Sequence, residues 1–326
     1  MNSSKTNMHG FTLVEIMIAL TLGLILTAGV IVMFTVNSST QRVVQENSRL
    51  QENARFALNE IMLKLRMVNF SGCNSNIDFS NTKEFLNTAD VSASKAFYND
   101  IVTNGMINVY KDSTGLPTAL SSDSAITEDI NGIQSDMLVI RGVDDQGAQL
   151  VTAQNGGTDG DIQIANTGYV AKDDTLFLAD CEKAALFQAG NVSNSASTST
   201  ISLRQAISNT DIFYDDAILY QYQVNVFYVG KSDIKNSKGQ PIPALYQKTN
   251  SDNPFELAQG ISDLNFSFGI DTDDDGKPNK FVDAGEVSAS EWINVTVIKV
   301  QVTAVPIEDI GMTTGRVFFA TVSLRN

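Results

Sequence analysis

The stretch Gly10-Phe11-Thr12-Leu13-Val14-Glu15 opens an apolar run that extends to Val36. Glu15 is the one charged residue between Phe11 and Val36. The run is long enough to cross a bilayer, because about 20 apolar residues suffice. A carboxylate in a membrane helix costs about 2.5–3.5 kcal/mol at the bilayer centre and less near an end. Glu15 is therefore a candidate functional residue; the alternative is an ordinary signal anchor that tolerates one acid near its start.

The apolar run is preceded by a short polar leader, residues 1–10, whose one full side-chain charge is Lys5. Lys5 and the amino terminus favour a cytoplasmic leader and an exported body. A secretory signal carries its small-residue cleavage site after the apolar run. Here Gly10 precedes the run, and the residues that follow Val36 contain no such site. We therefore expect residues 11–36 to be retained as a transmembrane helix.

Residues 37–69 continue the helix with a different pattern. Apolar residues recur at steps of three, four and seven, which places them on one face of a helix: Val43, Leu50, Ala54, Ala57, Ile61, Leu65 and Val68. Charged residues occupy the other positions, and no proline interrupts the pattern. The first half of the helix should lie among lipid or other apolar helices, and the amphipathic half against a globular domain.

Residues 70–326 read as a β-rich globular domain, because runs of Val, Ile, Phe and Tyr alternate with Gly, Asn, Asp and Ser. The expected strands are 106–110, 137–141, 149–153, 162–165, 175–179, 217–229, 264–268, 292–305 and 316–324. Three segments look like loops: 112–136, 191–200 and the hairpin loop 231–243. Segment 191–200 could also separate two β lobes. The predicted class is α+β, with a long N-terminal helix packed on a large antiparallel sheet body.

Composition and charge narrow the functional classes. The chain has 326 residues, 43% of them hydrophobic, and a net charge of -15. That composition suits a packed core and argues against a nucleic-acid partner, which needs clustered Lys and Arg. The single histidine, His9, precedes the apolar run. If the leader is removed, histidine-dependent triads and metal sites are excluded. We expect no enzyme, although paired-carboxylate catalysis stays chemically possible.

The two cysteines, Cys73 and Cys181, both follow the anchor. An even count in an exported domain favours a disulfide over two buried free thiols. Such a bridge would close a loop of about 100 residues, for which the chain-entropy account gives roughly 4–5 kcal/mol as an upper figure.

The stretch Asp271-Thr272-Asp273-Asp274-Asp275-Gly276-Lys277-Pro278-Asn279 begins like a calcium loop. Asp stands at positions one, three and five and Gly at six, so oxygen ligands could converge around a sharp turn. The Lys277 carbonyl and the Asn279 side chain could add ligands. The twelfth position is Val282, so Asp283 or Glu286 would have to replace the usual bidentate acid. The sequence indicates a calcium turn or, alternatively, a solvated acidic turn.

The opening stretch, with its short leader and unbroken apolar helix, resembles the class III signal of type IV pilins and type II secretion pseudopilins. The resemblance implies cleavage between Gly10 and Phe11 by prepilin peptidase at the cytoplasmic membrane face, and N-methylation of Phe11. It also implies that Glu15 pairs with the new amino group of Phe11 on a neighbouring subunit during assembly. The cost of burying a carboxylate falls when a cation pairs with it, and this energetic argument agrees with the implied role of Glu15.

Further stretches narrow the resemblance to PilW-type minor pilins. They are Ser135-Asp136-Met137-Leu138-Val139-Ile140-Arg141, Asp180-Cys181-Glu182-Lys183-Ala184-Ala185-Leu186-Phe187-Gln188, Leu257-Ala258-Gln259-Gly260-Ile261, Gly269-Ile270-Asp271-Thr272-Asp273 and Trp292-Ile293-Asn294-Val295. Individually these stretches are moderate signals, but their order spans nearly the whole chain.

The PilW resemblance implies a minor pilin that helps to initiate or cap type IV pilus assembly in a tip complex, and so supports twitching motility. The implied partners are other minor pilins, the major pilin, prepilin peptidase and the assembly platform. The implied location is the inner membrane of a Gram-negative bacterium, with a periplasmic C-terminal domain, and then the pilus tip. The alternatives are a large pseudopilin of type II secretion, and a membrane-anchored calcium-binding carbohydrate-binding domain or hydrolase.

Overall fold

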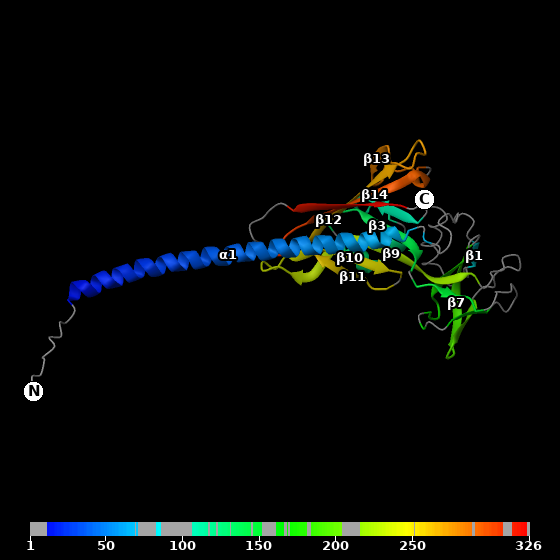
Figure 1. Cartoon of the computed structure of the whole chain (residues 1–326), viewed down its shortest axis with the longest axis horizontal. Coiled ribbons are helices and arrows are strands. Elements are labelled where there is room, and N and C mark those ends of the chain that lie inside the picture. Colours follow the sequence, from blue (N-terminus) through cyan, green and yellow to red (C-terminus); the bar gives the residue numbers. More distant parts are fainter. Residues whose placement is uncertain are drawn as a thin grey trace, which may run out of the picture. The chain divides into compact units, whose positions relative to one another are not determined.

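The computed structural model describes a long helix and two β-sheets (Figure 1). The described residues are 12–68, 70, 83–85, 106–116, 118–121, 123–130, 132–144, 146–151, 161–165, 168, 170–180, 184–203, 216–250, 252–288, 291–308 and 315–324. The chain divides into two compact units, residues 1–49 and residues 50–326. Each unit is described by itself.

The long helix α1 spans Leu13–Arg66, close to the predicted bounds. The run contains no proline and is rich in Leu, Ile and Ala, so nothing in the sequence interrupts it. Its ends agree with the helix dipole, because Glu15 lies in the first turn and Lys64 and Arg66 lie in the last. The Thr12 hydroxyl accepts a hydrogen bond from the Glu15 backbone N–H at 3.3 Å.

In the second unit, one face of α1 is part of the hydrophobic core. Its buried residues are Leu50, Ala54, Ala57, Leu58, Ile61, Met62, Leu65 and Val68. They share a cluster with residues of β12 (Ile261–Ile270) and β14 (Val295–Ala304). The Asn53 side-chain amide donates to the Gln259 carbonyl at 2.9 Å, which adds a polar contact beside the apolar one. From Leu50 on, the predicted amphipathic face is confirmed.

The larger sheet contains eleven strands within the described residues. Its order is β11-β10-β9-β6-β7-β8-β5, and β1 to β4 pair beside this path. The strands are β1 (Lys83–Phe85), β2 (Ile107–Tyr110), β3 (Met137–Val143), β4 (Ala148–Gln149), β5 (Ile162–Ala165), β6 (Thr175–Ala179), β7 (Ala184–Asn194), β8 (Thr198–Leu203), β9 (Ile218–Lys235), β10 (Pro241–Thr249) and β11 (Phe255–Gln259).

The pairing in this sheet is antiparallel apart from β1 with β7. Strand β9 is its longest member and pairs with β6 through residues 218–221 and with β10 through residues 225–235. Tyr220 and Tyr222, near its start, are buried. One continuous strand thus belongs to both the β3–β10 region and the β6–β7 region of the sheet.

The smaller sheet has the order β13-β12-β14-β15, with β13 at Lys280–Asp283 and β15 at Arg316–Ser323. All of its pairs are antiparallel. One of its faces supplies apolar residues to the core that contains α1, among them Phe266, Val300 and Val322. The predicted α+β class, a long helix with a large antiparallel body, is confirmed.

The two sheets are joined by the Ser135–Asp136 pair, which lies just before β3. The Ser135 hydroxyl accepts from the Leu264 N–H at 2.9 Å, and the Asp136 N–H donates to the Leu264 carbonyl at 2.9 Å. The Asp136 carboxylate accepts from the N–H groups of Phe266 and Asp112. Burial raises the pKa of Asp136, although these two hydrogen bonds act in the opposite direction. A buried acid thus serves as acceptor for the backbone N–H of Phe266 in β12 and for that of Asp112.

Several sequence expectations were wrong in detail. Segment 191–200, expected as a loop or lobe boundary, is a β7–β8 hairpin, because the Ser195 side chain accepts from the Thr198 N–H and closes the turn. Of the strand expected at 149–153, Gln149 ends β4 and Leu150 forms an isolated bridge with Ile164, while residues 152–153 lie outside the described residues. Segment 292–305 begins with a 3-10 helix, η3 (Trp292–Asn294), where the Trp292 ring packs edge-on against Phe268.

Segment 112–136 was expected as a loop but contains two short helices, α3 (Thr118–Ser121) and α4 (Ser124–Asp129). A further 3-10 helix, η2 (Lys111–Ser113), begins the segment. Asp123 caps α4 by accepting a hydrogen bond from the Ala125 N–H at 3.1 Å. This N-cap is a local helix signal within a segment whose composition resembles that of a loop. The hairpin loop predicted at 231–243 is confirmed but shorter, since β9 reaches Lys235 and β10 begins at Pro241.

Candidate functional site

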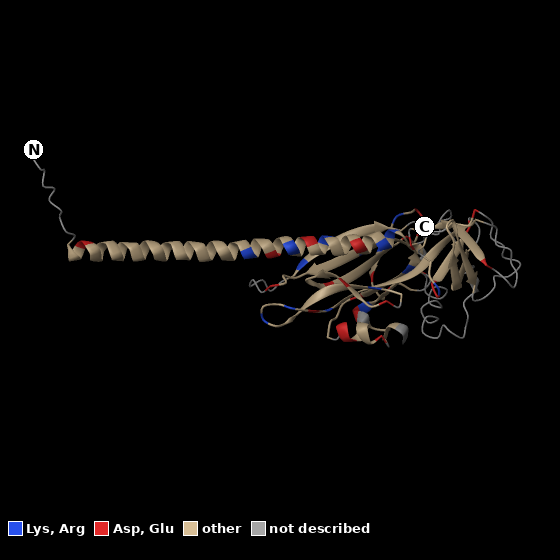
Figure 2. Cartoon of the chain, turned by 90° about the horizontal axis from the view of Figure 1, so that it is seen from below, with Lys and Arg blue, Asp and Glu red and all other residues tan. Residues whose placement is uncertain are grey.

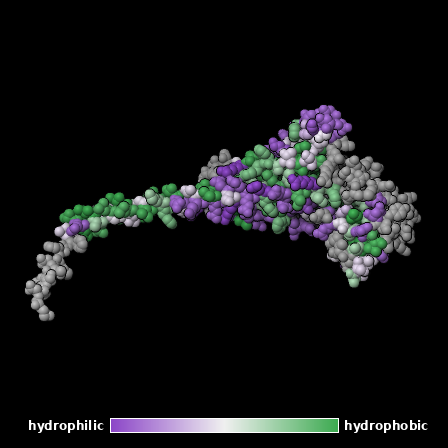
Figure 3. All heavy atoms as spheres, viewed as in Figure 1, coloured by the Kyte–Doolittle hydropathy of each residue, from purple (hydrophilic) through white to green (hydrophobic). Residues whose placement is uncertain are grey.

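The first candidate site is the apolar half of α1, residues 13–36. Its large apolar side chains are exposed, for example Leu24 and Leu26 at 71% each. Figure 3 shows this stretch as hydrophobic, and Figure 2 shows a long part of α1 without charged residues between an acid at its start and the charged residues of its second half. Within the described residues, α1 is the helix long and apolar enough to cross a membrane, and an 18-residue stretch of it has a mean hydropathy of 2.6. So large an apolar surface needs lipid or other subunits around it.

Polar groups in this half of α1 are of two kinds. The hydroxyls of Thr21, Thr27 and Thr35 donate to backbone carbonyls of the preceding turn at 2.8–2.9 Å, so the helix itself satisfies them. The Glu15 carboxylate has no hydrogen bond or ion pair with any residue that the structure describes. Glu15 therefore offers an anionic acceptor on an apolar surface. Gly10 and Phe11 lie outside the described residues, so the cleavage and methylation expected there stay predictions.

The second candidate site is the acidic loop between β12 and β13. One carboxylate oxygen from each of Asp271, Asp273 and Asp275 lies within 4.8 Å of the others. Asp271 is buried and accepts from the N–H groups of Asp273, Asp274 and Gly276 at 3.2, 2.8 and 2.7 Å. Positive φ angles at Asp274 and Gly276 turn the chain tightly enough to bring these donors inward.

The carboxylates of the acidic loop have pKa values shifted in opposite directions. Burial by itself would raise the pKa of Asp271, but the hydrogen bonds from Gly276, Asp273 and Asp274 outweigh it and lower that pKa. The pKa of Asp273 is raised, first by its hydrogen bond with Asp271, then by burial and by the negative charges of Asp275 and Asp271. Three acids so close together repel one another, and a cation between them would relieve that repulsion.

The other expected ligands lie differently. The Asn279 side-chain oxygen accepts from both the N–H and the hydroxyl of Thr272, at 3.1 and 2.9 Å. Asp283 is the last residue of β13 and pairs with Ser267, outside the group of three acids. Lys280 and Ser288 donate hydrogen bonds to the Glu291 carboxylate, and these bonds lower the pKa of Glu291 to about 2. The described geometry thus brings together Asp271, Asp273 and Asp275 from the predicted set.

Two family models match parts of this chain. Residues 226–315 match the family model of type IV pilus-assembly protein W, PilW. Residues 5–31 match the model of the prokaryotic N-terminal methylation motif. The resemblance to PilW-type minor pilins is confirmed. Comparison with curated proteins and with solved structures found no match.

The two matches relate the chain to type IV pilus-assembly proteins, and an apolar helix such as α1 suits the membrane anchor of such a protein. The PilW match begins inside β9 and ends just before β15, so it contains the acidic loop and most of the smaller sheet. The methylation match contains Gly10, Phe11 and Glu15. Cys73 and Cys181 lie outside the described residues, and the disulfide stays a prediction.

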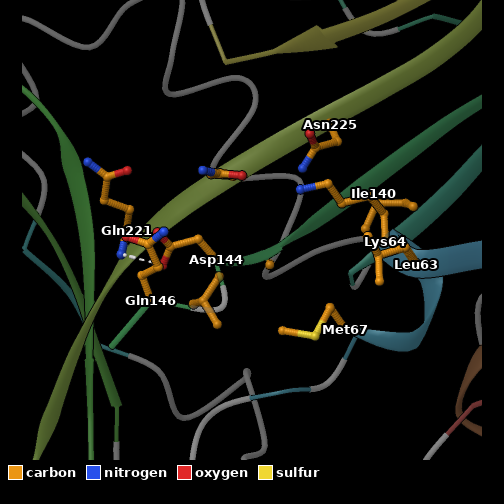
Figure 4. Close-up of a pocket in the computed structure, with 11 residues that line it drawn as sticks. Leu63, Lys64, Met67, Ile140, Asp144, Gln146, Gln221 and Asn225 are labelled. Carbon is orange, nitrogen blue, oxygen red and sulfur yellow. Dashed lines mark hydrogen bonds between the residues drawn. The ribbon is translucent and has the colours of Figure 1, made fainter. Parts of the chain in front are cut away.

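A pocket that sequence reasoning missed lies at the end of α1 in this PilW-like chain (Figure 4). Its volume is about 360 Å³, and its lining includes Lys64 and Met67 from α1 and Gln221 and Asn225 from β9. Asp144, which accepts from the Gln221 N–H at 3.3 Å, is the one carboxylate among the lining residues. The pocket therefore lacks the paired acids that the hydrolase alternative requires. No sequence pattern indicated it, because its residues come from three distant segments.

Proposed function

We propose that this minor pilin helps to initiate or cap type IV pilus assembly in a tip complex, after prepilin peptidase cuts between Gly10 and Phe11. Its partners would be other minor pilins, the major pilin and the assembly platform, and its C-terminal domain would lie in the periplasm of a Gram-negative cell. The match to type IV pilus-assembly protein W favours a pilus over a secretion pseudopilus and over the hydrolase or carbohydrate-binding alternative.

The observation that carries the proposal is Glu15. Its carboxylate has no partner among the described residues, and the surface around it is apolar and exposed. In lipid, an unpaired carboxylate is costly, so the acid favours any neighbour that brings a cation to the same depth. The new amino group of Phe11 on an adjacent subunit would be such a cation. The pair would form only after cleavage, which couples processing to assembly.

Two substitutions at Glu15 test the role. Glu15→Ala should leave the chain in the membrane fraction but lower its recovery in sheared pili by at least about tenfold, since each 1.4 kcal/mol of lost pairing is a factor of ten. Glu15→Asp keeps the charge and should recover part of the incorporation. Glu52→Ala, which removes an exposed acid from α1 outside the apolar half, is the matched control and should leave incorporation unchanged. Normal incorporation of Glu15→Ala would contradict the proposal.

We also propose that the acidic loop binds Ca²⁺ through Asp271, Asp273 and Asp275. Calcium takes six to eight oxygens, so carbonyl groups such as that of Lys277, and water, would complete the set. The three converging carboxylates fit a hard cation, whereas the hydrogen bonds of Asp271 also stabilise the turn without one. The test is calorimetric titration of the full chain in detergent with CaCl₂. A double variant, Asp273→Asn with Asp275→Asn, should abolish the heat, and no heat from the unmodified chain would sink the idea.

A further inference from the structure

The two edges of the smaller sheet differ in how they are protected. Strand β13 has four residues and a charged residue at each end, Lys280 and Asp283. Strand β15 has eight residues, pairs with β14 without any register shift, and contains no proline. Short strands, charges, prolines and bulges are the usual devices that prevent an edge from pairing with another chain. Arg316, at the start of β15, is the one such device on that strand.

Hydrogen bonding identifies which backbone groups of β15 point away from β14. The Leu324 N–H donates to the Thr296 carbonyl at 2.9 Å, and hydrogen-bonded positions alternate along an antiparallel pair. The even-numbered residues of β15 therefore bond β14. The pairing of β12 gives the same result. The Phe266 carbonyl accepts from the Ala284 N–H, so the even-numbered residues of β12 point away from β14. The odd-numbered residues of β12 therefore bond the odd-numbered residues of β14, which leaves the even-numbered residues of β14 to bond β15.

The odd-numbered residues of β15 thus direct their N–H and C=O groups to the free edge. They are Val317, Phe319, Thr321 and Ser323. Within the described residues, none of these backbone groups has a partner beyond the sheet. An extended segment of another chain could add to this edge with main-chain hydrogen bonds.

Side chains beside the free edge are apolar and exposed. Phe319 is 64% exposed and Val317 is 48% exposed, on the face of the sheet opposite the core. The Lys299 ammonium lies 5.0 Å from the centre of the Phe319 ring, a cation–π contact. An added strand would find both an aromatic contact and a positive charge here.

The two strands at this edge carry positive charge, whereas the whole chain is negatively charged. Strands β14 and β15 contain Lys299 and Arg316 and no acid, whereas the whole chain carries a net charge of -15. An acidic partner is therefore attracted. Two copies of β15 would instead bring like charges together, which disfavours self-pairing.

We propose that the free edge of β15 binds an extended, acidic strand of a different subunit of the same pilus. The inference rests on the proposed function, because it supposes that the chain assembles with other pilus subunits. This contact between globular domains would form in addition to the contact proposed for Glu15 within the membrane.

A proline on the free edge tests the proposal. Thr321→Pro removes an N–H that points away from β14, and proline is tolerated at such positions. We expect the full chain in detergent to keep its thermal midpoint while its recovery in sheared pili falls about tenfold relative to its amount in the membrane. Thr321→Val keeps the N–H and is the matched control. Normal incorporation of a folded Thr321→Pro chain overturns the proposal.

Photocrosslinking decides the matter if Thr321→Pro lowers the thermal midpoint. Phe319→benzoylphenylalanine in the otherwise unmodified full chain should crosslink, in intact cells, to an acidic segment of another pilus subunit. The same label at Asn265, on the same face of β12 but away from the edge, is the control. A self-adduct, an adduct to a basic segment, or equal adducts from both positions would overturn the proposal.

Glu15→Ala separates the two ideas. If the proposed function fails, Glu15→Ala and Thr321→Pro both leave pilus recovery unchanged. If only the edge proposal fails, Glu15→Ala still lowers recovery and Thr321→Pro does not.

Discussion

Two stretches of one helix, α1, meet different surroundings. Residues 50–66 bury an apolar face in the core of the globular unit, and Ile61 is completely buried there. Residues 13–36 expose apolar side chains on every side, and Ile25 is 68% exposed. The backbone hydrogen bonds are helical in both stretches, so the difference lies in what covers the side chains. Residues 50–66 are covered by their own chain, whereas the apolar surface of residues 13–36 is suited to lipid or other subunits.

The largest effect should come from the same substitution made in both stretches. Ile61→Ala leaves a cavity and should lower the free energy of unfolding by about 2–5 kcal/mol. Ile25→Ala should change it by less than about 0.5 kcal/mol, because the side chain has no packed surroundings in the chain itself. Denaturant unfolding of the full chain in detergent, followed by near-ultraviolet circular dichroism, measures both. Equal losses would break the comparison.

Two carboxylates give the next test, since Asp136 accepts two backbone N–H groups and Glu15 has no partner among the described residues. Asp136→Asn replaces one acceptor oxygen by a donor and should lower the free energy of unfolding by about 1–3 kcal/mol. Glu15→Gln should leave it unchanged.

Asp136 should also make the free energy of unfolding depend on pH. The pKa of Asp136 is raised in the folded state by burial, so as pH rises above about 4 the unfolded chain loses this proton first. Its stabilising contribution is complete below the unfolded pKa and is lost as pH rises through the folded pKa. The stability of the unmodified chain relative to Asp136→Asn should therefore fall over that window. A rising difference would show that the sign is wrong.

A smaller effect is expected from Asn53, whose side chain bonds the Gln259 carbonyl. Asn53→Ala should lower the free energy of unfolding by about 0.5–1.5 kcal/mol. Asn37→Ala, in the exposed part of α1, gains the same helix propensity without losing such a contact and is the control. Matching results at the two positions would show that the contact contributes nothing.

The smallest effect is expected at Thr27, whose hydroxyl bonds the Gly23 carbonyl of its own helix. Thr27→Val should change the unfolding free energy by less than about 0.5 kcal/mol, because the carbonyl keeps its backbone partner. Pilus recovery should also stay near that of the unmodified chain. A large loss of pilus recovery with normal stability would instead place Thr27 in a contact between subunits.

Local patterns predicted the long helix, most strands and the acidic turn. The period of the apolar residues fixed α1, and the spacing of Asp271, Asp273 and Asp275 around Gly276 brought the three carboxylates together as expected. Prediction failed where distant partners decide the structure. Segment 191–200 is polar yet forms a hairpin, because its two arms pair with each other and β8 also pairs with the distant strand β5.

Local sequence patterns specify the long apolar helix, its single acid and the N-terminal methylation signal, since each depends on residues close together in the chain. Only the tertiary structure decided the roles of Ser135 and Asp136, whose partners on β12 lie about 130 residues away and are invisible to any local pattern. The same holds for the free edge of β15. A strand becomes an edge through the order of strands in the sheet, and its own eight residues carry no sign of that position.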